Sequence, residues 1–123
     1  MDARLREGIS LFNAGRFFES HEILEQFYQA AEEVSKPFLE GLIELAVAFR
    51  LYADFGEIKG PVRMIYQALI RFENYQTTYL GIRVKDLSGT METWAKAADA
   101  GGKPLTSLPN IPLEEETFLK SFC

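Results

Sequence analysis

Hydrophobic residues recur every three or four positions along most of the chain, which is the spacing of one face of an α-helix. Gly15 suits the left-handed position after a helix, while Pro37 and Pro61 suit first helical turns. These breaks predict five helices, which run from Ala3 to Asn13, from Phe17 to Ala31, from Phe38 to Ala53, from Gly60 to Gly81 and from Val84 to Ala100.

The third predicted helix is apolar around nearly its whole circumference. Between Phe38 and Ala53 only three residues carry charge, namely Glu40, Glu44 and Arg50. A helix of this kind is usually central and buried, so we expect the other helices to pack around it. Gly41 lies on this helix and predicts the close approach of a second helix, because glycine has no side chain to hold a neighbour away.

The C-terminal stretch has a different pattern, in which prolines alternate with aliphatic residues from Pro104 to Pro112. This pattern predicts an extended strap lying on the helices, followed by a short helix from Leu113 to Phe122. Strand-like alternation is absent from the sequence, so we predict an all-α fold of about five helices packed as antiparallel hairpins. Residues 1–103 then form a helical bundle domain, and residues 104–123 form a strap and short helix packed on the same domain.

Composition and charge exclude several classes of function. The chain has 123 residues, enough for one domain, and a formal net charge of -5. An acidic surface repels phosphate backbones, so we expect no nucleic-acid partner. The charged start lacks the apolar segment of a secretory signal, and the longest apolar run, Leu45 to Phe49, is too short to span a bilayer. We therefore expect a cytoplasmic protein without a membrane partner. Cys123, the single cysteine, can form neither an internal disulfide nor a cysteine zinc site.

The candidate chemistry lies around the only histidine. A helical wheel places His21 on the apolar face of the second helix, with Glu22 beside it and Glu25 one turn later. The sequence His-Glu-x-x-Glu lacks the second histidine of the metalloprotease signature, and one histidine is also too few for a ferritin-like di-metal site. A mononuclear site for Mn²⁺, Fe²⁺ or Zn²⁺, built from His21, Glu25 and Glu44, remains geometrically possible.

A structural interpretation of the same residues is favoured. A histidine on an apolar face more often hydrogen-bonds a carboxylate across a helix interface and so helps to fix the packing. Glu44 in a nearly apolar helix must be paired, protonated or facing water, and a salt bridge to Arg50 or Arg71 is the favoured arrangement. The sequence contains no phosphate-binding loop, no dinucleotide fingerprint and no nucleophile elbow.

Two stretches resemble a known family. Phe-Asn-x-Gly-x-Phe-Phe-Glu-x-His-Glu-x-Leu-Glu, from Phe12 to Glu25, and Gly-Leu-Ile-Glu-Leu-Ala-Val-Ala, from Gly41 to Ala48, resemble the bacterial and archaeal family called domain of unknown function 309. The resemblance covers roughly Leu5 to Trp94. The family usually has tryptophan where Tyr28 stands and glutamine where Glu44 stands. The resemblance implies a small all-α, tetratricopeptide-like bundle and brings no established activity, cofactor or substrate.

The first predicted hairpin is also similar to half of a tetratricopeptide repeat, on the residues Gly8, Gly15-Arg16-Phe17, Ser20 and Leu24. Such hairpins usually bind proteins or peptides. Two hypotheses follow. The favoured one is a non-enzymatic interaction or scaffold domain that binds a protein partner or a second copy of itself, without a cofactor. The alternative is a small-molecule or divalent-metal site at His21, Glu22, Glu25 and Glu44, with hydrolysis as its candidate reaction.

Overall fold

The computed structural model describes residues 1–101 and 108–114. Within these residues a short 3₁₀ turn, Glu33–Ser35, precedes the third helix, and two-residue strands β1 (Thr78–Tyr79) and β2 (Ile82–Arg83) form an antiparallel hairpin. The helices are α1 (Ala3–Asn13), α2 (Phe17–Ala30), α3 (Lys36–Phe55), α4 (Lys59–Phe72) and α5 (Val84–Asp99). The predicted all-α class with five main helices is confirmed.

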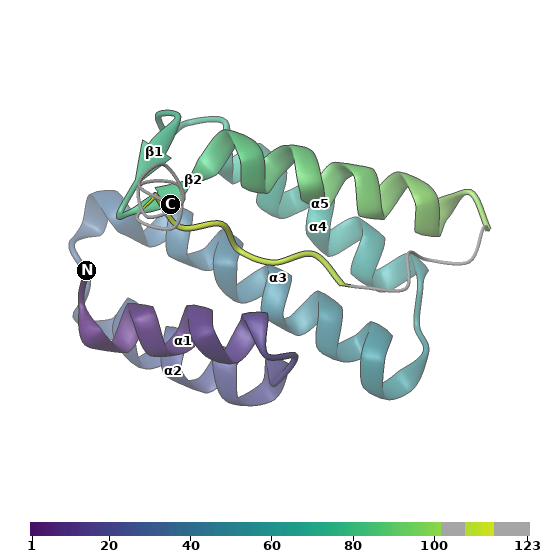
Figure 1. The fold of residues 1–123 in the computed structure, drawn as a ribbon, viewed down its shortest axis with the longest axis horizontal. Coiled ribbons are helices and arrows are strands. Elements are labelled where there is room, and N and C mark those ends of the chain that lie inside the picture. The colour runs from purple at the N-terminus through teal and green to yellow at the C-terminus, as the bar shows by residue number, and fades with distance from the viewer. Residues whose placement is uncertain (102–107, 115–123) are drawn as a thin grey trace, which may run out of the picture.

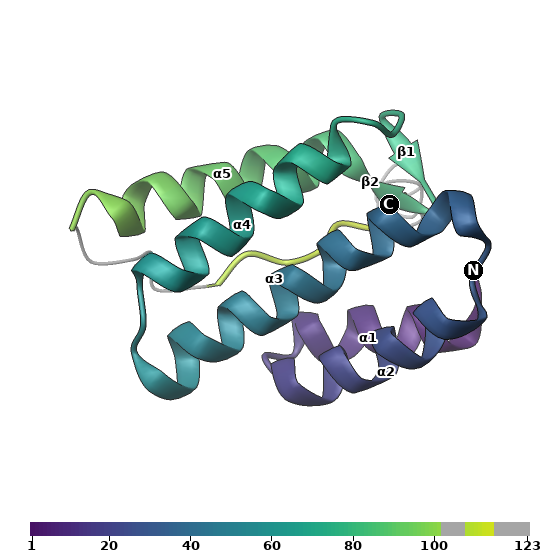
Figure 2. The ribbon, with the colours of Figure 1, turned by 180° about the vertical axis from the view of Figure 1, so that it is seen from behind.

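The helices lie in two layers around α3. Helices α1 and α5 lie on one side of the molecule, with residues 108–114 running between them and across α3 (Figure 1). Seen from behind, α2, α3 and α4 lie side by side in the other layer (Figure 2). Helix α3 is thus flanked by α2 and α4 and covered on its inner face by α1, α5 and the C-terminal segment.

Two groups of aromatic rings join the other elements to α3. Near its C-terminal end, Phe49 contacts the rings of Phe12, Phe17 and Trp94 with centroids 4.9–5.8 Å apart. Near its start, Phe38 contacts Phe72, Tyr75 and Tyr79, each with centroids 5.1 Å apart. Such edge-to-face and tilted ring pairs add stability beyond the area they bury. These contacts confirm the prediction that α3 is the buried centre of the fold.

Glycines allow two close helix contacts. A Cβ atom placed on Gly41 would lie 2.5 Å from Cε1 of Phe72 in α4, which confirms the predicted close approach. A Cβ on Gly8 would lie 2.7 Å from Cδ2 of Leu24, and the Ser20 hydroxyl donates a hydrogen bond to the Gly8 carbonyl at 2.7 Å. These three residues belong to the tetratricopeptide-like set, and in this fold they hold α1 against α2.

The predicted extension of the fourth helix to Gly81 is wrong, because a short two-stranded hairpin stands in place of its last turns. Helix α4 ends at Phe72, and Tyr79 lies in β1 instead of on the helical stripe. The turn between the strands has positive φ at both Leu80 (51°) and Gly81 (80°), as the favoured two-residue hairpin turns require. Tyr75 also leaves the helix to donate a hydrogen bond from its hydroxyl to the Val34 carbonyl at 2.8 Å.

The C-terminal segment, where described, has the predicted extended form. Residues 108–113 contain no helix, and Leu113 forms a bridge to Ile82 of β2. The buried side chains alternate along the segment, with Ile111 and Leu113 inward and Glu114 exposed. Residues 104–107 and most of the predicted helix from Leu113 to Phe122 lie outside the described residues. Among the described helices, none is long and apolar enough to cross a bilayer.

We predict that Gly41→Ala lowers the free energy of unfolding by about 1–3 kcal/mol, because the new methyl group must displace the packed Phe72 ring. Gly89→Ala is the matched control. It also lies inside a helix, nothing lies within 4 Å of its added Cβ, and the substitution should stabilise by about 0.5–1 kcal/mol. Urea denaturation of both variants measures the difference. Equal stabilities would contradict the close packing of α3 on α4.

Candidate functional site

His21 lies at the edge of the core and not on the buried face of α2. Phe17, Ser20 and Leu24 make up that buried face, whereas the His21 side chain is 34% exposed. Its Nε2 lies 3.1 Å from a carboxylate oxygen of Glu25, one turn later on the same helix. The predicted hydrogen bond across a helix interface is therefore wrong. The buried face is rotated toward Ser20 because α2 packs against α1 as well as α3, and Ser20 meets the α1 backbone.

Glu44 forms the salt bridge that the sequence favoured, and its partner is Arg71 of α4. The Arg71 Nε lies 2.7 Å from Glu44, and its Nη1 lies 2.7 Å from Glu40, one turn earlier on α3. The Glu44 side chain is only 17% exposed, so this guanidinium compensates a half-buried charge. Arg50, the other predicted partner, instead lies 3.6 Å from Asp54 and over the ring of Phe18.

Tyr28 connects α2 to the same carboxylates. Its hydroxyl donates a hydrogen bond to Glu40 at 2.8 Å, so both oxygens of Glu40 have partners. That hydrogen bond, together with partial burial and the nearby negative charges of Glu40, Glu33 and Glu25, raises the pKa of the Tyr28 phenol. We call Glu25, Tyr28, Glu40, Glu44 and Arg71 the outer polar cluster. It lies where α2, α3 and α4 adjoin.

Two shallow hollows meet at Glu25. One, of about 270 Å³, is lined by the outer polar cluster and Ile43. The other, of about 510 Å³, lies along α2 and includes His21, Glu22 and Glu25. The structure thus brings His21 to Glu25 and Glu44 to Arg71, but His21 does not line the hollow that holds Glu44. In the described part of the chain, no three His, Cys, Asp or Glu side chains gather into a group that could hold a metal ion.

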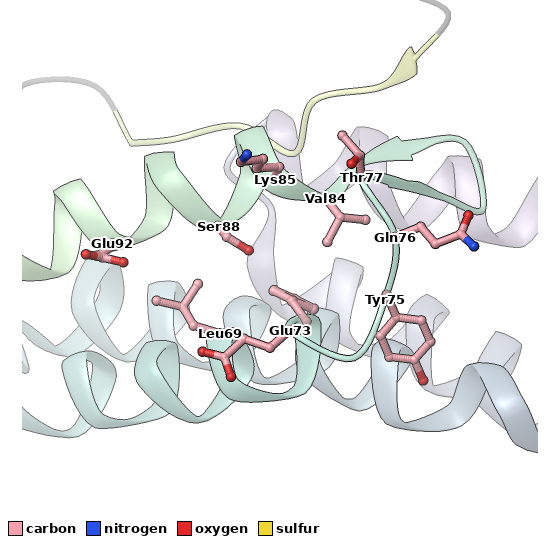
Figure 3. Close-up of a pocket in the computed structure, with 10 residues that line it drawn as sticks. Leu69, Glu73, Tyr75, Gln76, Thr77, Val84, Lys85, Ser88 and Glu92 are labelled. Carbon is pink, nitrogen blue, oxygen red and sulfur yellow. The ribbon is translucent and has the colours of Figure 1, made fainter.

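A third hollow, of about 250 Å³, lies between the end of α4 and the start of α5 (Figure 3). Ser88 and Glu92 of α5 lie opposite Leu69 of α4 and Glu73, the residue that follows this helix, across it. Glu92 forms an ion pair with Lys96 at 2.8 Å. None of the four residues predicted as a site lines this hollow, and it adds no chemistry to them.

The C-terminal segment is held on the other side of α3 through its backbone. The Ile111 N–H donates to Oδ1 of Asn13 at 2.7 Å, and Nδ2 of Asn13 donates to the Ile111 carbonyl at 3.1 Å. The Arg83 N–H donates to the Pro112 carbonyl at 3.0 Å, and the Glu114 N–H donates to the Gly81 carbonyl at 2.8 Å. We call residues 108–114 the strap, and Asn13 with residues 81–83 the strap seat.

Sequence reasoning missed the role of Asn13. The sequence identifies this residue only as part of a helix end, whereas its side chain binds both backbone groups of Ile111, 98 positions away. An asparagine in the last turn of a helix is ordinary, and only the alternation of Pro and aliphatic residues in the strap hints at a partner. Tyr28 and Glu40 were likewise outside the predicted site, because each by itself fits an amphipathic helix.

Comparison with known proteins adds a family and no activity. The family model described as "Domain of unknown function (DUF309)" matches residues 5–64, which confirms the resemblance seen in the sequence. An uncharacterized protein from Aquifex aeolicus (strain VF5) is 28% identical over 113 residues, which cover 90% of this chain and 33% of that protein. The chain therefore spans about a third of the length of this curated relative.

We predict that Glu44→Gln and Arg71→Met each destabilise the protein, with a coupling energy of about 1 kcal/mol in a double-mutant cycle. Charged hydrogen bonds contribute about 1.5–3 kcal/mol when buried, and the partial exposure of Arg71 reduces that value. The control cycle pairs Glu44→Gln with Arg63→Met, an exposed arginine on the same helix, and should show no coupling. A coupling energy of zero in the first cycle would show that the Glu44–Arg71 pair does not hold α3 against α4.

We also predict that His21→Gln changes stability by less than about 0.5 kcal/mol, since an exposed pair one helical turn apart contributes little. The thermal midpoint of the metal-free protein should stay constant when Mn²⁺, Fe²⁺, Zn²⁺, Mg²⁺ or Ca²⁺ is added. Binding to the native state would raise the midpoint. A rise in the parent that disappears in His21→Gln would identify a metal site and restore the alternative hypothesis.

Proposed function

Because residues 5–64 match a family model whose description assigns no activity, we propose a function from the geometry. The chain is a non-enzymatic interaction domain that binds an extended segment of a partner protein in the strap seat. A single observation carries the proposal: in this fold an extended stretch of polypeptide lies between α1 and α5, held by hydrogen bonds to its main chain (Figure 1).

The contacts of the strap match a known way of binding peptides. Leu113 pairs with Ile82 in antiparallel fashion, so the strap adds a strand to the β1–β2 hairpin. In strand addition the main-chain hydrogen bonds supply affinity, and pockets for alternate side chains supply specificity. Here Ile111 is fully buried and Leu113 nearly so, while the residues between and after them face outward. The seat therefore has both components of a peptide-binding site.

The chemistry of the seat favours an apolar segment without much charge. The residues that bond the strap, Asn13 and the backbone at Gly81 and Arg83, use amide donors and acceptors instead of ionic groups. Such groups recognise any extended backbone, and the buried positions of Ile111 and Leu113 select aliphatic side chains. The predicted homo-oligomer is one form of this proposal, since a second copy carries the same segment.

The second candidate, a small-molecule or metal site at His21, Glu22, Glu25 and Glu44, is also a proposal. It is supported by the position of Glu25, which lines both hollows near these residues. Against it, Glu44 is bound by Arg71, and both oxygens of the neighbouring Glu40 are already engaged. A ligand there would have to compete with these bonds, and we therefore rank this candidate second.

We predict that random peptides displayed on phage will be enriched on the full-length Ile111→Ala protein. The truncated side chain leaves space in the seat and weakens the bound strap, because losing a buried isoleucine costs about 2–5 kcal/mol. The enriched peptides should carry two aliphatic residues separated by one position. Sequencing of the selected pool measures how often the enriched peptides carry this spacing of aliphatic residues.

The matched control is the same selection on Ile111→Ala combined with Asn13→Ala, which removes the side chain that binds both backbone groups at position 111. Enrichment should be lost on this protein, while a control substitution on the opposite face, Glu25→Gln, should leave it intact. Circular dichroism confirms that each variant is folded. Absence of enrichment on folded Ile111→Ala, or the same peptides on both proteins, would contradict the proposed function.

A further inference from the structure

We infer that the strap is an intramolecular competitor of the partner, so that the chain binds its partner only when residues 108–114 leave the seat. The inference rests on the proposed function and concerns the regulation of the same site. Its starting point is that the seat is already filled: Ile111 is fully buried, and its N–H and carbonyl are both bound by Asn13. A partner segment that uses Asn13 and β2 must displace these contacts.

The strap is joined to the helices by few described hydrogen bonds, and its two buried side chains, Ile111 and Leu113, pack on the core. The backbone bonds join it to one side chain at the end of α1 and to residues 81–83. The core of α3 is packed by rings from the helices and the segment before β2, and those ring contacts do not involve the strap. Release of the strap therefore exposes Ile111, Leu113 and the apolar surface beneath them, while the ring contacts that join the helices to α3 do not depend on it.

Pro112 of the strap indicates which sequence a competing partner segment should have. Pro112 has no N–H, yet it occupies the position between the two buried side chains and bonds only through its carbonyl, to the Arg83 N–H. The seat therefore requires an N–H at the positions of Ile111 and Glu114 and none at position 112. Proline also holds a free peptide extended, which lowers the entropy lost on binding. The partner segment is an extended aliphatic–x–aliphatic sequence in which x tolerates proline.

The tethered strap should weaken the binding of a free peptide by a factor that can be measured. A tethered ligand acts at an effective concentration on the order of mM, and a binding site that is rarely open has its apparent affinity reduced by the open fraction. If the free segment binds the empty seat at about 10 μM, the intact chain should bind it about 100-fold more weakly. Weakening the strap alone should recover most of this factor.

The test uses a fluorescein-labelled peptide, Leu-Pro-Asn-Ile-Pro-Leu-Glu, with the sequence of the strap and blocked termini. Fluorescence anisotropy measures its binding to four full-length proteins: the parent, Ile111→Ala, Asn110→Ala and the combination of Ile111→Ala with Asn13→Ala. We expect Ile111→Ala to bind at least tenfold more tightly than the parent. Asn110→Ala is the matched control, because this strap residue is exposed and should leave the affinity of the parent unchanged. The combined variant should not bind.

Two modified peptides test the backbone recognition. N-methylation at the isoleucine removes the N–H that donates a hydrogen bond to Oδ1 of Asn13. This change should abolish binding of the peptide to Ile111→Ala. Replacement of the second proline by alanine should change the affinity by less than about threefold, since position 112 uses only its carbonyl. Binding that is insensitive to the methyl group would mean that the peptide binds elsewhere, and this result would overturn the inference.

The outcomes separate the regulation from the function. Equal and measurable affinity of the parent and Ile111→Ala would overturn the competition and leave the binding function standing. No binding to folded Ile111→Ala would overturn both.

If Ile111→Ala does not fold, hydrogen exchange of the parent decides. Amides of Ile111 and Glu114 should exchange at least tenfold faster than those in the middle of α3, through local opening. Exchange of both sets at one common rate, through global unfolding alone, would show that the strap is part of the core and would overturn the competition.

Discussion

The need to bury α3 on nearly every side determines where the other elements lie. This helix has so few polar residues that only one narrow stripe of its surface can be exposed to solvent. Helices α2 and α4 cover its flanks, and α1, α5 and the strap cover its inner face (Figures 1 and 2). Gly41 lets α4 approach so closely that the Phe72 ring occupies the space of the missing side chain. Tight packing of this kind leaves little room for alternative arrangements.

The remaining stripe of α3 and its inner face carry different chemistry. The outer stripe holds Glu40 and Glu44, whose charges are compensated by Arg71 across the α3–α4 contact. A half-buried carboxylate without such a partner would be costly, so the cluster is explained by stability without any ligand. The inner face instead needs an apolar cover, and Ile111 of the strap provides part of it. Backbone hydrogen bonds to Asn13 and β2 fix the position of that cover.

This arrangement is the reason we propose an interaction role. The only histidine is partly exposed and is paired with Glu25 on its own helix. The strap seat, in contrast, holds an extended stretch of this chain through hydrogen bonds to its main chain.

The sequence alone determined the helices, the central position of α3 and the close approach at Gly41, because these depend on local periodicity and on side-chain size. It also identified the extended strap from its alternating prolines.

Only the tertiary structure decided how these parts meet. Helix α4 ends at Phe72, and Tyr75 and Tyr79 beyond it pack on Phe38 of α3. His21 lies at the edge because α2 is shared between two neighbours, and Arg71 was one of two equal choices for Glu44 until the helices were placed. The bond between Asn13 and Ile111 joins positions 98 residues apart, and no local pattern encodes such a contact.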